Sequence, residues 1–204
     1  MGKEQSVLDH VLATAPKDDP DAIIAAVDQY CSDGNRMMNL GAEKGLIVDR
    51  AIDNISAQKV LELGSFFGYS ATRMASRIGA NGSLITIEAD PERHDVSRQM
   101  VEHAGLSNRV QLLKGKAGDM IPELQGQFDL VLIDHYGENY LPDLKLIEEH
   151  NLLRHGSAVV ADNVIAHRPT VDPYLEHVRS SGCYRSTLHK VGGDGVEVSI
   201  WLDA

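Results

Sequence analysis

The sequence predicts an α/β fold with a doubly wound, mostly parallel sheet. From residue 59 onward, short β-branched apolar runs alternate with helix-like segments, which is typical of parallel strands joined by helices. A glycine-containing turn follows the first of these runs and opens a helix. Near the C-terminus two β-like runs flank the turn at 192–195. That pattern indicates an antiparallel hairpin at one edge of the sheet.

The first part of the chain has the texture of helices. We predict helices over 5–15 and 20–56. The second begins at Asp19-Pro20-Asp21, a good helix start, and places Ile23 and Val27 on one face. With 204 residues the chain is long enough for one domain with a substantial core.

The remaining elements follow in alternation. Strands are predicted at 59–63, 83–88, 109–113, 128–134 and 157–163, and helices at 70–78, from Pro91 onward, and at 141–150. The hairpin takes 183–191 and 196–202. Runs buried on both faces are expected for strands of a parallel sheet.

Composition and charge exclude several partners. The chain has 19 basic and 30 acidic residues, a net charge of −11, which disfavours nucleic acid and anionic membranes because both attract basic surfaces. Cys31 and Cys183 lack disulfide-framework or metal-site spacing. With no signal-like or membrane-spanning run, we expect a soluble, cytoplasmic protein, monomeric or homodimeric.

Polar residues close two of the predicted strands. Asp134 ends one, and Asp162 with Asn163 ends the next. Neighbouring strands lie about 4.8 Å apart, so these oxygen donors could hold one hard divalent cation such as Mg²⁺. The alternative is ordinary turn chemistry or helix capping.

A second motif follows the first strand. Glu62, Gly64, Gly68 and Ser70 form a turn that opens a helix, and Glu88 ends the next strand. An acid there is placed for a ribose hydroxyl, and glycines permit close approach of a ligand. The spacing is not Gly-x-Gly-x-x-Gly, so a phosphate-free nucleoside such as S-adenosylmethionine fits better than a dinucleotide. The alternative is a tight turn with a strand-terminal glutamate.

Taken together, the segments of this chain resemble the catechol O-methyltransferase family from about residue 7 to the C-terminus. The segments that carry the resemblance, in chain order, are Met38-Asn39, Gly45–Asp49, Leu61–Gly64, Gly68–Ser70, Ile85–Glu88, Asp134-His135, Tyr140–Asp143, Ala161–Ile165 and Asp194–Glu197.

The resemblance implies a class I, Rossmann-like methyltransferase fold with a seven-stranded sheet, and helices in 1–56 that cover the cofactor and substrate site of a 57–204 core. It implies a ligand set for Mg²⁺, namely Asp134, Asp162 and Asn163, and a hydrogen bond from Glu197 to a catechol hydroxyl. It also implies contacts to S-adenosylmethionine from Met38, Leu40, Glu62, Gly64, Ser70, Glu88, Gly118, Asp134 and His135.

The chain departs from the family where a lysine usually acts as general base. Here that position is Gly137, which cannot carry a proton. Three readings stay open. The cation alone acidifies the hydroxyl; a neighbour, Glu138, His135 or His167, replaces the lysine; or the protein is a weak catalyst that mainly binds the cofactor.

The substrate side departs as well. Arg36 stands where the family has an aromatic residue, His167 stands where it has a proline, and Tyr136 keeps an aromatic wall. Met38 and Asn163 are also expected to contact the substrate. We expect Arg36 and His167 to favour a carboxylated catechol, such as a dihydroxybenzoate or a caffeate-like acid, because guanidinium pairs well with carboxylate.

Rival functions fit less well. A nicotinamide-dependent oxidoreductase would need the missing glycine fingerprint and leaves Asp162 and Asn163 unexplained. A related methyltransferase for a larger acceptor, a caffeoyl thioester or a flavonoid, would keep the same metal ligands. Native substrate, regioselectivity, oligomeric state and mobility of the segment around 33–41 are not fixed by the sequence.

Overall fold

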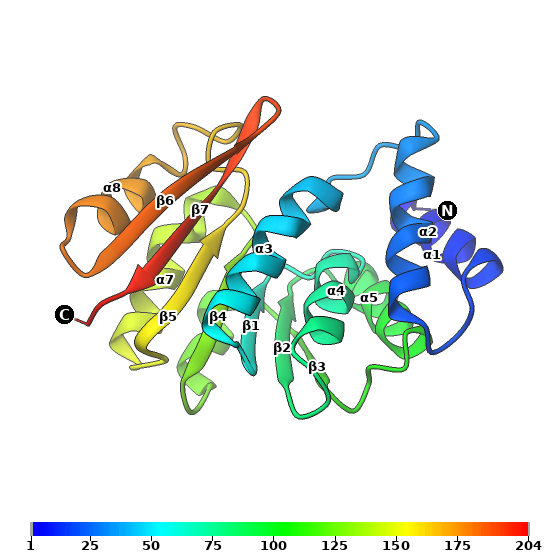
Figure 1. Ribbon diagram of the computed structural model, residues 1–204, viewed down its shortest axis with the longest axis horizontal. Helices are drawn as coiled ribbons and strands as arrows, with labels where there is room; N and C mark the ends of the chain where they lie inside the picture. The colour runs from blue at the N-terminus through cyan, green and yellow to red at the C-terminus, as the bar shows by residue number, and fades with distance from the viewer. Residues whose placement is uncertain (1, 204) are drawn as a thin grey trace.

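A seven-stranded sheet forms the centre of the computed structural model, which describes residues 2–203 (Figure 1). The strand order is β3-β2-β1-β4-β5-β7-β6, and β7 runs antiparallel to both neighbours. The predicted class is therefore confirmed. The strands are β1 (Lys59–Leu63), β2 (Ser83–Glu88), β3 (Val110–Lys114), β4 (Phe128–Ile133), β5 (Leu153–Ala161), β6 (Tyr184–Val191) and β7 (Asp194–Trp201).

Helices cover both faces of the sheet (Figure 1). On one face α3 (Gly41–Ile55), α4 (Tyr69–Arg77) and α5 (Pro91–His103) pack on the strands, with α1 (Lys3–Thr14) and α2 (Pro20–Ser32) as an outer layer. The other face is covered by α6 (Ala117–Met120), α7 (Tyr140–Glu149) and α8 (Asp172–Ser180). Two short 3₁₀ helices adjoin these helices: Ile121–Glu123 follows α6, and Gly137–Asn139 precedes α7.

The single helix predicted over 20–56 is wrong. The chain leaves the helix after Ser32 and starts α3 at Gly41. Gly34 lies within the break and Gly41 is the first residue of α3; their φ values of +94° and +69° are left-handed, a conformation that glycine adopts freely and that interrupts a continuous helix. The break produces a mostly exposed segment, 33–39, that reaches the carboxyl end of the sheet. A second difference lies near the C-terminus, where we predicted no helix and the structure has α8.

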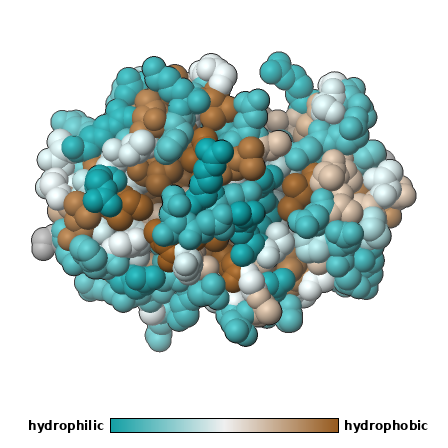
Figure 2. Space-filling view, viewed as in Figure 1, coloured by the Kyte–Doolittle hydropathy of each residue, from teal (hydrophilic) through white to brown (hydrophobic). Residues whose placement is uncertain are grey.

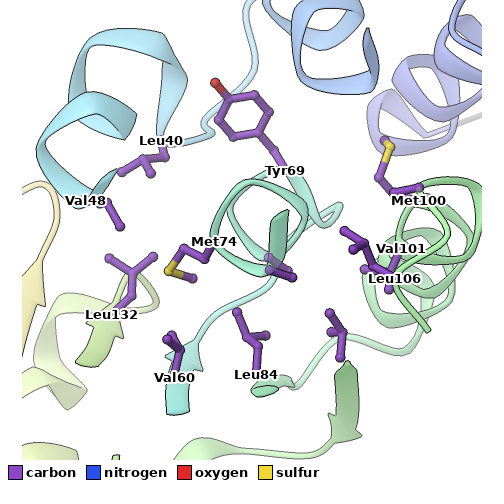
Figure 3. Close-up of a cluster of buried hydrophobic side chains, with 14 of the residues drawn as sticks. Leu40, Val48, Val60, Tyr69, Met74, Leu84, Met100, Val101, Leu106 and Leu132 are labelled. Carbon is purple, nitrogen blue, oxygen red and sulfur yellow. The ribbon is translucent and has the colours of Figure 1, made fainter. Parts of the chain in front are cut away.

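Alternation along the strands divides the core in two. On β4, Leu130 and Leu132 face the α3–α5 side, while Val131 and Ile133 face α7 and α8, as the pleat requires. Figure 3 shows the first cluster, with Val60, Leu84 and Leu132 from the sheet meeting Met74 of α4. Both layers are fully buried, so the strands that carry the polar ends are held rigidly.

The outer surface over α3 and α4 is mostly hydrophilic, with apolar side chains showing between the polar ones (Figure 2). Among the described residues, no helix combines the length and apolarity needed to span a membrane.

Candidate functional site

The carboxyl ends of the parallel strands open into a cavity of about 820 Å³. The strand order reverses direction between β1 and β4, and ligands of open α/β sheets bind at such a switch point. Twelve of the predicted site residues line the cavity: Met38, Leu40, Gly64, Ser70, Glu88, Gly118, Asp134, His135, Tyr136, Glu138, Asn163 and His167.

The glycine turn packs against the protein itself. A Cβ on Gly64, whose φ is +99°, would lie 2.5 Å from the carbonyl oxygen of Asp134, and one on Gly68 would lie 2.9 Å from Ser97 Oγ. We expected these glycines to admit a ligand. In the structure they let the turn after β1 approach the β4 loop and α5, and so fix the cavity wall.

Glu88 closes this turn from the neighbouring strand. Its Oε2 accepts a hydrogen bond from the Phe66 amide (2.8 Å) and its Oε1 accepts one from the Asp90 amide (2.9 Å). A carboxylate oxygen has more than one acceptor site. Glu88 is therefore held in place by backbone donors and still has acceptor capacity toward the cavity.

Glu62 lies beneath the turn and is fully buried. Its Oε2 accepts from Thr86 Oγ1, whereas Oε1 is one of the buried polar atoms without a partner within residues 2–203. Burial raises the pKa of this carboxyl to about 7, and the Ser70 and Thr86 hydroxyls oppose the rise only in part. Glu62 does not itself line the cavity, but Gly64 and Ser70 next to it do. An unpartnered buried acceptor behind this wall is a feature that calls for a ligand group or water.

His135 forms a rigid wall on the opposite side. Its Nε2 lies 2.6 Å from Asp143 Oδ2, and its ring stacks on Tyr140 with centroids 5.4 Å apart. Asp143 in turn approaches Gly118, where a Cβ would lie 3.1 Å from Asp143 Oδ1. The predicted pair of Gly118 and His135 is thus brought together by Asp143, which the sequence reasoning missed.

The predicted ligand set also converges. The Asn163 amide nitrogen, Nδ2, donates to Asp134 Oδ1 (3.0 Å) and to Asp162 Oδ2 (3.2 Å). Asn163 has a φ of +57°, a left-handed conformation that asparagine tolerates better than most residues. Asn163 Nδ2 therefore lies between Asp134 Oδ1, which follows β4, and Asp162 Oδ2, which follows β5.

Two residues that the sequence reasoning missed complete this cluster. The Lys44 Nζ of α3 lies 2.8 Å from Asp162 Oδ1, 3.1 Å from Asn163 Oδ1 and 2.7 Å from Asp194 Oδ2. Asp194 Oδ1 accepts from the amides of Ile165 (3.2 Å) and Ala166 (2.9 Å). Lys44 thus connects α3, the end of β5 and the β6–β7 hairpin.

The charges in the cluster perturb one another. Loss of hydration, followed by Asp162 and Glu62, raises the pKa of Asp134 well above its ordinary range. Burial raises the pKa of Asp162, although Lys44 opposes the rise. Burial would lower the pKa of Lys44, but Asp162 and Asp194 outweigh it and raise that pKa, so Lys44 is a fixed ammonium and not a proton acceptor.

Gly137 sits where the family places a lysine, and its surroundings are too close for a side chain unless its neighbours shift. A Cβ there would lie 2.8 Å from Thr170 Oγ1 and 2.9 Å from Val171 Cγ1. Val171 is fully buried. The turn at Gly137 packs closely against the residues that precede α8, and this packing is compatible with glycine at the position where the family has a lysine.

The other predicted substrate residues separate into two groups. Tyr136, Met38, Glu138 and His167 surround the cavity mouth, where the Tyr136 and Met38 side chains are exposed.

The structure does not bring Arg36 or Glu197 to the cavity. Arg36 is exposed in the 33–39 segment and is not a lining residue, and the Glu197 carboxylate accepts from Arg179 Nε and Nη2 at 2.7 Å each. Alternation along β7 turns Glu197 toward α8, and the break after Ser32 leaves Arg36 in solvent. Their contacts with a substrate stay predictions.

The predicted donor set has the chemistry of a divalent-cation site. Within residues 2–203 no group of three or more His, Cys, Asp or Glu side chains is placed to hold a metal; the predicted set has two carboxylates, with an amide as its third member. Its chemistry fits Mg²⁺, which prefers oxygen ligands. Turning the Asn163 amide by half a rotation would present three oxygens to one point. A cation bound there would offset the Asp162 charge, which together with burial raises the pKa of Asp134.

Comparison with known proteins places the chain in a family. The O-methyltransferase family model matches residues 18–181. Catechol O-methyltransferase B of Danio rerio is 39% identical, over 98% of this chain and 79% of the relative. Catechol O-methyltransferase of Mus musculus is 40% identical, over 91% and 71%.

A solved structure, that of cofactor-bound Rv0187 from MTB, superposes with a TM-score of 0.79 at 27% identity, covering 89% of this chain and 90% of that one. Sequence and fold therefore agree. The chain belongs to the catechol O-methyltransferase family of S-adenosylmethionine-dependent O-methyltransferases.

Proposed function

We propose that the protein transfers the methyl group of S-adenosylmethionine to one hydroxyl of a catechol-type substrate, with Mg²⁺ as the metal ion. The observation that carries the proposal is the convergence of Asp134, Asp162 and Asn163 beside the cavity. Two vicinal hydroxyls are a natural complement to a hard cation that three protein oxygens leave partly open.

The residues of the β1 and β2 ends would hold the cofactor. Glu88, fixed by two backbone donors, would accept ribose hydroxyls, and the unpartnered Oε1 of Glu62 offers negative charge to a cationic group. His135, oriented by Asp143, would cover the base. This half of the site binds and orients, and alignment of reacting groups can be worth about 7–11 kcal/mol.

Asp134, Asp162 and Asn163 would hold Mg²⁺, which when bound lowers the pKa of a contacting hydroxyl and fixes its direction. In the overall reaction the hydroxyl loses its proton to solvent and its oxygen gains the methyl group, while the sulfonium loses that methyl group and becomes a neutral thioether. Tyr136 and Met38 supply an apolar rim that would position the ring of the substrate.

We expect no side chain to replace the lysine base. Lys44 is held as an ammonium, and His135 is fixed by Asp143 and by stacking on Tyr140 in the place where it would cover the base of the cofactor. Glu138 and His167 line the cavity but are exposed. Replacing either singly, as Glu138→Gln or His167→Gln, should leave the position of the pH–rate profile unchanged. A variant that abolishes the basic limb of the profile would instead identify the proton acceptor.

The experiment is transfer of a labelled methyl group to catechol, to phenol and to a carboxylated catechol, each with Mg²⁺ and with a chelator. The proposal expects product from the catechols only, and none with the chelator. Equal transfer to phenol, or full activity in the chelator, would contradict the role of the cation. Product only with a larger phenolic acceptor would favour the related methyltransferase activity, and cofactor binding without transfer would favour a binding protein.

A further inference from the structure

The contacts of Asp162 divide its two oxygens between different tasks. Oδ1 receives the Lys44 ammonium (2.8 Å) and the Asn163 amide N–H (2.7 Å). Oδ2 contacts only Asn163 Nδ2 (3.2 Å) within the described chain. A carboxylate oxygen accepts about two hydrogen bonds, so Oδ1 is fully used and Oδ2 faces the point of convergence.

Lys44 is held in that position from its other side. Its second carboxylate partner, Asp194, is itself fixed by the amides of Ile165 and Ala166. The side chains of Lys44 and Asp194 are 14% and 16% exposed, so water competes weakly for these contacts. The partly buried contact with Asp194 therefore helps to hold the ammonium beside Asp162 Oδ1.

We propose that Lys44, positioned by Asp194, selects Mg²⁺ over Ca²⁺ by allowing Asp162 to bind a cation through one oxygen only. This inference rests on the proposed function, because it concerns the same cation site. Mg²⁺ takes six ligands in near-octahedral array, whereas Ca²⁺ takes six to eight and commonly gains them by two-oxygen binding to a carboxylate.

The proposal predicts how the cluster changes when a cation binds. Asn163 turns its amide oxygen inward and gives up the Lys44 contact, while Lys44 keeps Asp162 Oδ1 and Asp194 Oδ2. Lys44 is thus a positioning residue, and removing it should change the relative affinity for two cations. A general loss of positive charge would instead strengthen the binding of both cations together.

The test measures metal affinity directly and does not use activity. Mn²⁺ bound to the protein is followed by electron paramagnetic resonance and displaced by Mg²⁺ or Ca²⁺. The ratio of the Ca²⁺ and Mg²⁺ dissociation constants is compared in wild type, Lys44→Met, Asp194→Asn and Lys17→Met. Lys17, exposed in the α1–α2 turn, is the control for loss of one positive charge.

We expect the Ca²⁺/Mg²⁺ ratio to fall at least fivefold in Lys44→Met, to fall less in Asp194→Asn and to stay unchanged in Lys17→Met. An unchanged ratio in Lys44→Met, with both affinities rising together, would overturn the proposal. If Lys44→Met does not fold, the ratio in Asp194→Asn decides in the same way. A wild-type protein that binds none of these cations would overturn the proposed cation site itself, a different outcome from an unchanged ratio.

Discussion

The site contains two acidic clusters, and they are built differently. At the cofactor side, Glu88 is held by backbone amides only two and twenty-two residues away. At the cation side, Asp162 and Asn163 are held by Lys44, 119 residues from Asn163, and Lys44 by Asp194, 150 residues away. The first cluster is a local property of strand ends and a turn, whereas the second exists only when distant elements have packed.

The two clusters also balance their charge differently. Glu62 has no cation beside it, and its burial favours the protonated form. Asp162 has the Lys44 ammonium, yet Asp134 beside it has a strongly raised pKa. The cofactor side is therefore suited to a ligand that brings positive charge, and the cation side to a second positive charge in addition to Lys44. The following changes test this contrast.

Asp162→Asn should have the largest effect and should separate the two clusters. We expect a loss of methyl transfer of about 1,000-fold, corresponding to about 4 kcal/mol, because the cation loses a charged ligand. The dissociation constant for S-adenosylmethionine, measured by calorimetry, should change less than about threefold. Asp119→Asn, which removes an exposed acid from the same cavity, is the control and should keep its activity. A parallel loss of cofactor binding would show that the clusters are not independent.

Glu62→Gln tests the uncompensated charge at the cofactor side. The pKa of Glu62 is raised from 4.5 to about 7 in the folded protein. Its contribution to stability is therefore present at low pH and is lost as pH rises through 7. The cofactor-free wild type should lose about 2 to 3 kcal/mol relative to Glu62→Gln between pH 5 and pH 8. Urea unfolding at both values measures this, and a constant difference between the proteins would refute the charge assignment.

Glu88→Gln should weaken the cofactor side without touching the cation side. One acceptor of charged hydrogen bonds is lost, worth about 1.5 to 2 kcal/mol. We therefore expect S-adenosylmethionine to bind about ten- to thirtyfold more weakly. Mn²⁺ affinity should stay as in the wild type. Glu92→Gln, at the exposed start of α5, is the control for charge, and equal weakening there would rule out a specific contact.

Gly137→Ala has the smallest expected effect and tests the turn that replaces the lysine base. The added methyl group would meet Thr170 and Val171, and overpacking of this kind costs about 1 to 2 kcal/mol. Gly193→Ala, where the Cβ meets nothing within 4 Å, should leave the urea midpoint nearly unchanged. The cost should fall when Gly137→Ala is combined with Thr170→Ala. A Gly137→Lys variant that is fully stable and more active would contradict the packing argument.

Much of the cofactor side could be predicted from the sequence. Glu62, Gly64, Ser70 and Glu88 occur at fixed distances from two strands that have a clear apolar pattern, so their placement follows from strand register. Asp134 and Asn163 were predictable in the same way because parallel strands end at one edge. The structural need for glycine at positions 64 and 68 was not predictable, because the residues that approach them, Asp134 and Ser97, come from other elements.

The rest depends on tertiary packing. Lys44 carried a weak signal, since it falls on the same helical face as Val48 and Ile52, where a charged residue needs a partner. Asp194 lies in a glycine-rich turn, and its sequence context did not distinguish a residue that pairs with Lys44 from an ordinary turn aspartate. The partner of Glu197, Arg179, belongs to α8. We did not use the Asp172-Pro173 start and the apolar face of that helix, so the orientation of Glu197 toward α8 was not predicted.

The most direct test of the central claim is a crystal structure with Mn²⁺ and S-adenosylmethionine, using the anomalous signal of the metal. We predict one peak within coordination distance of Asp134 Oδ1, Asp162 Oδ2 and the Asn163 amide oxygen, with Lys44 still on Asp162 Oδ1. A peak elsewhere, or no peak while Lys44 still bridges Asp162 and Asn163, would contradict the claim that these residues form the cation site.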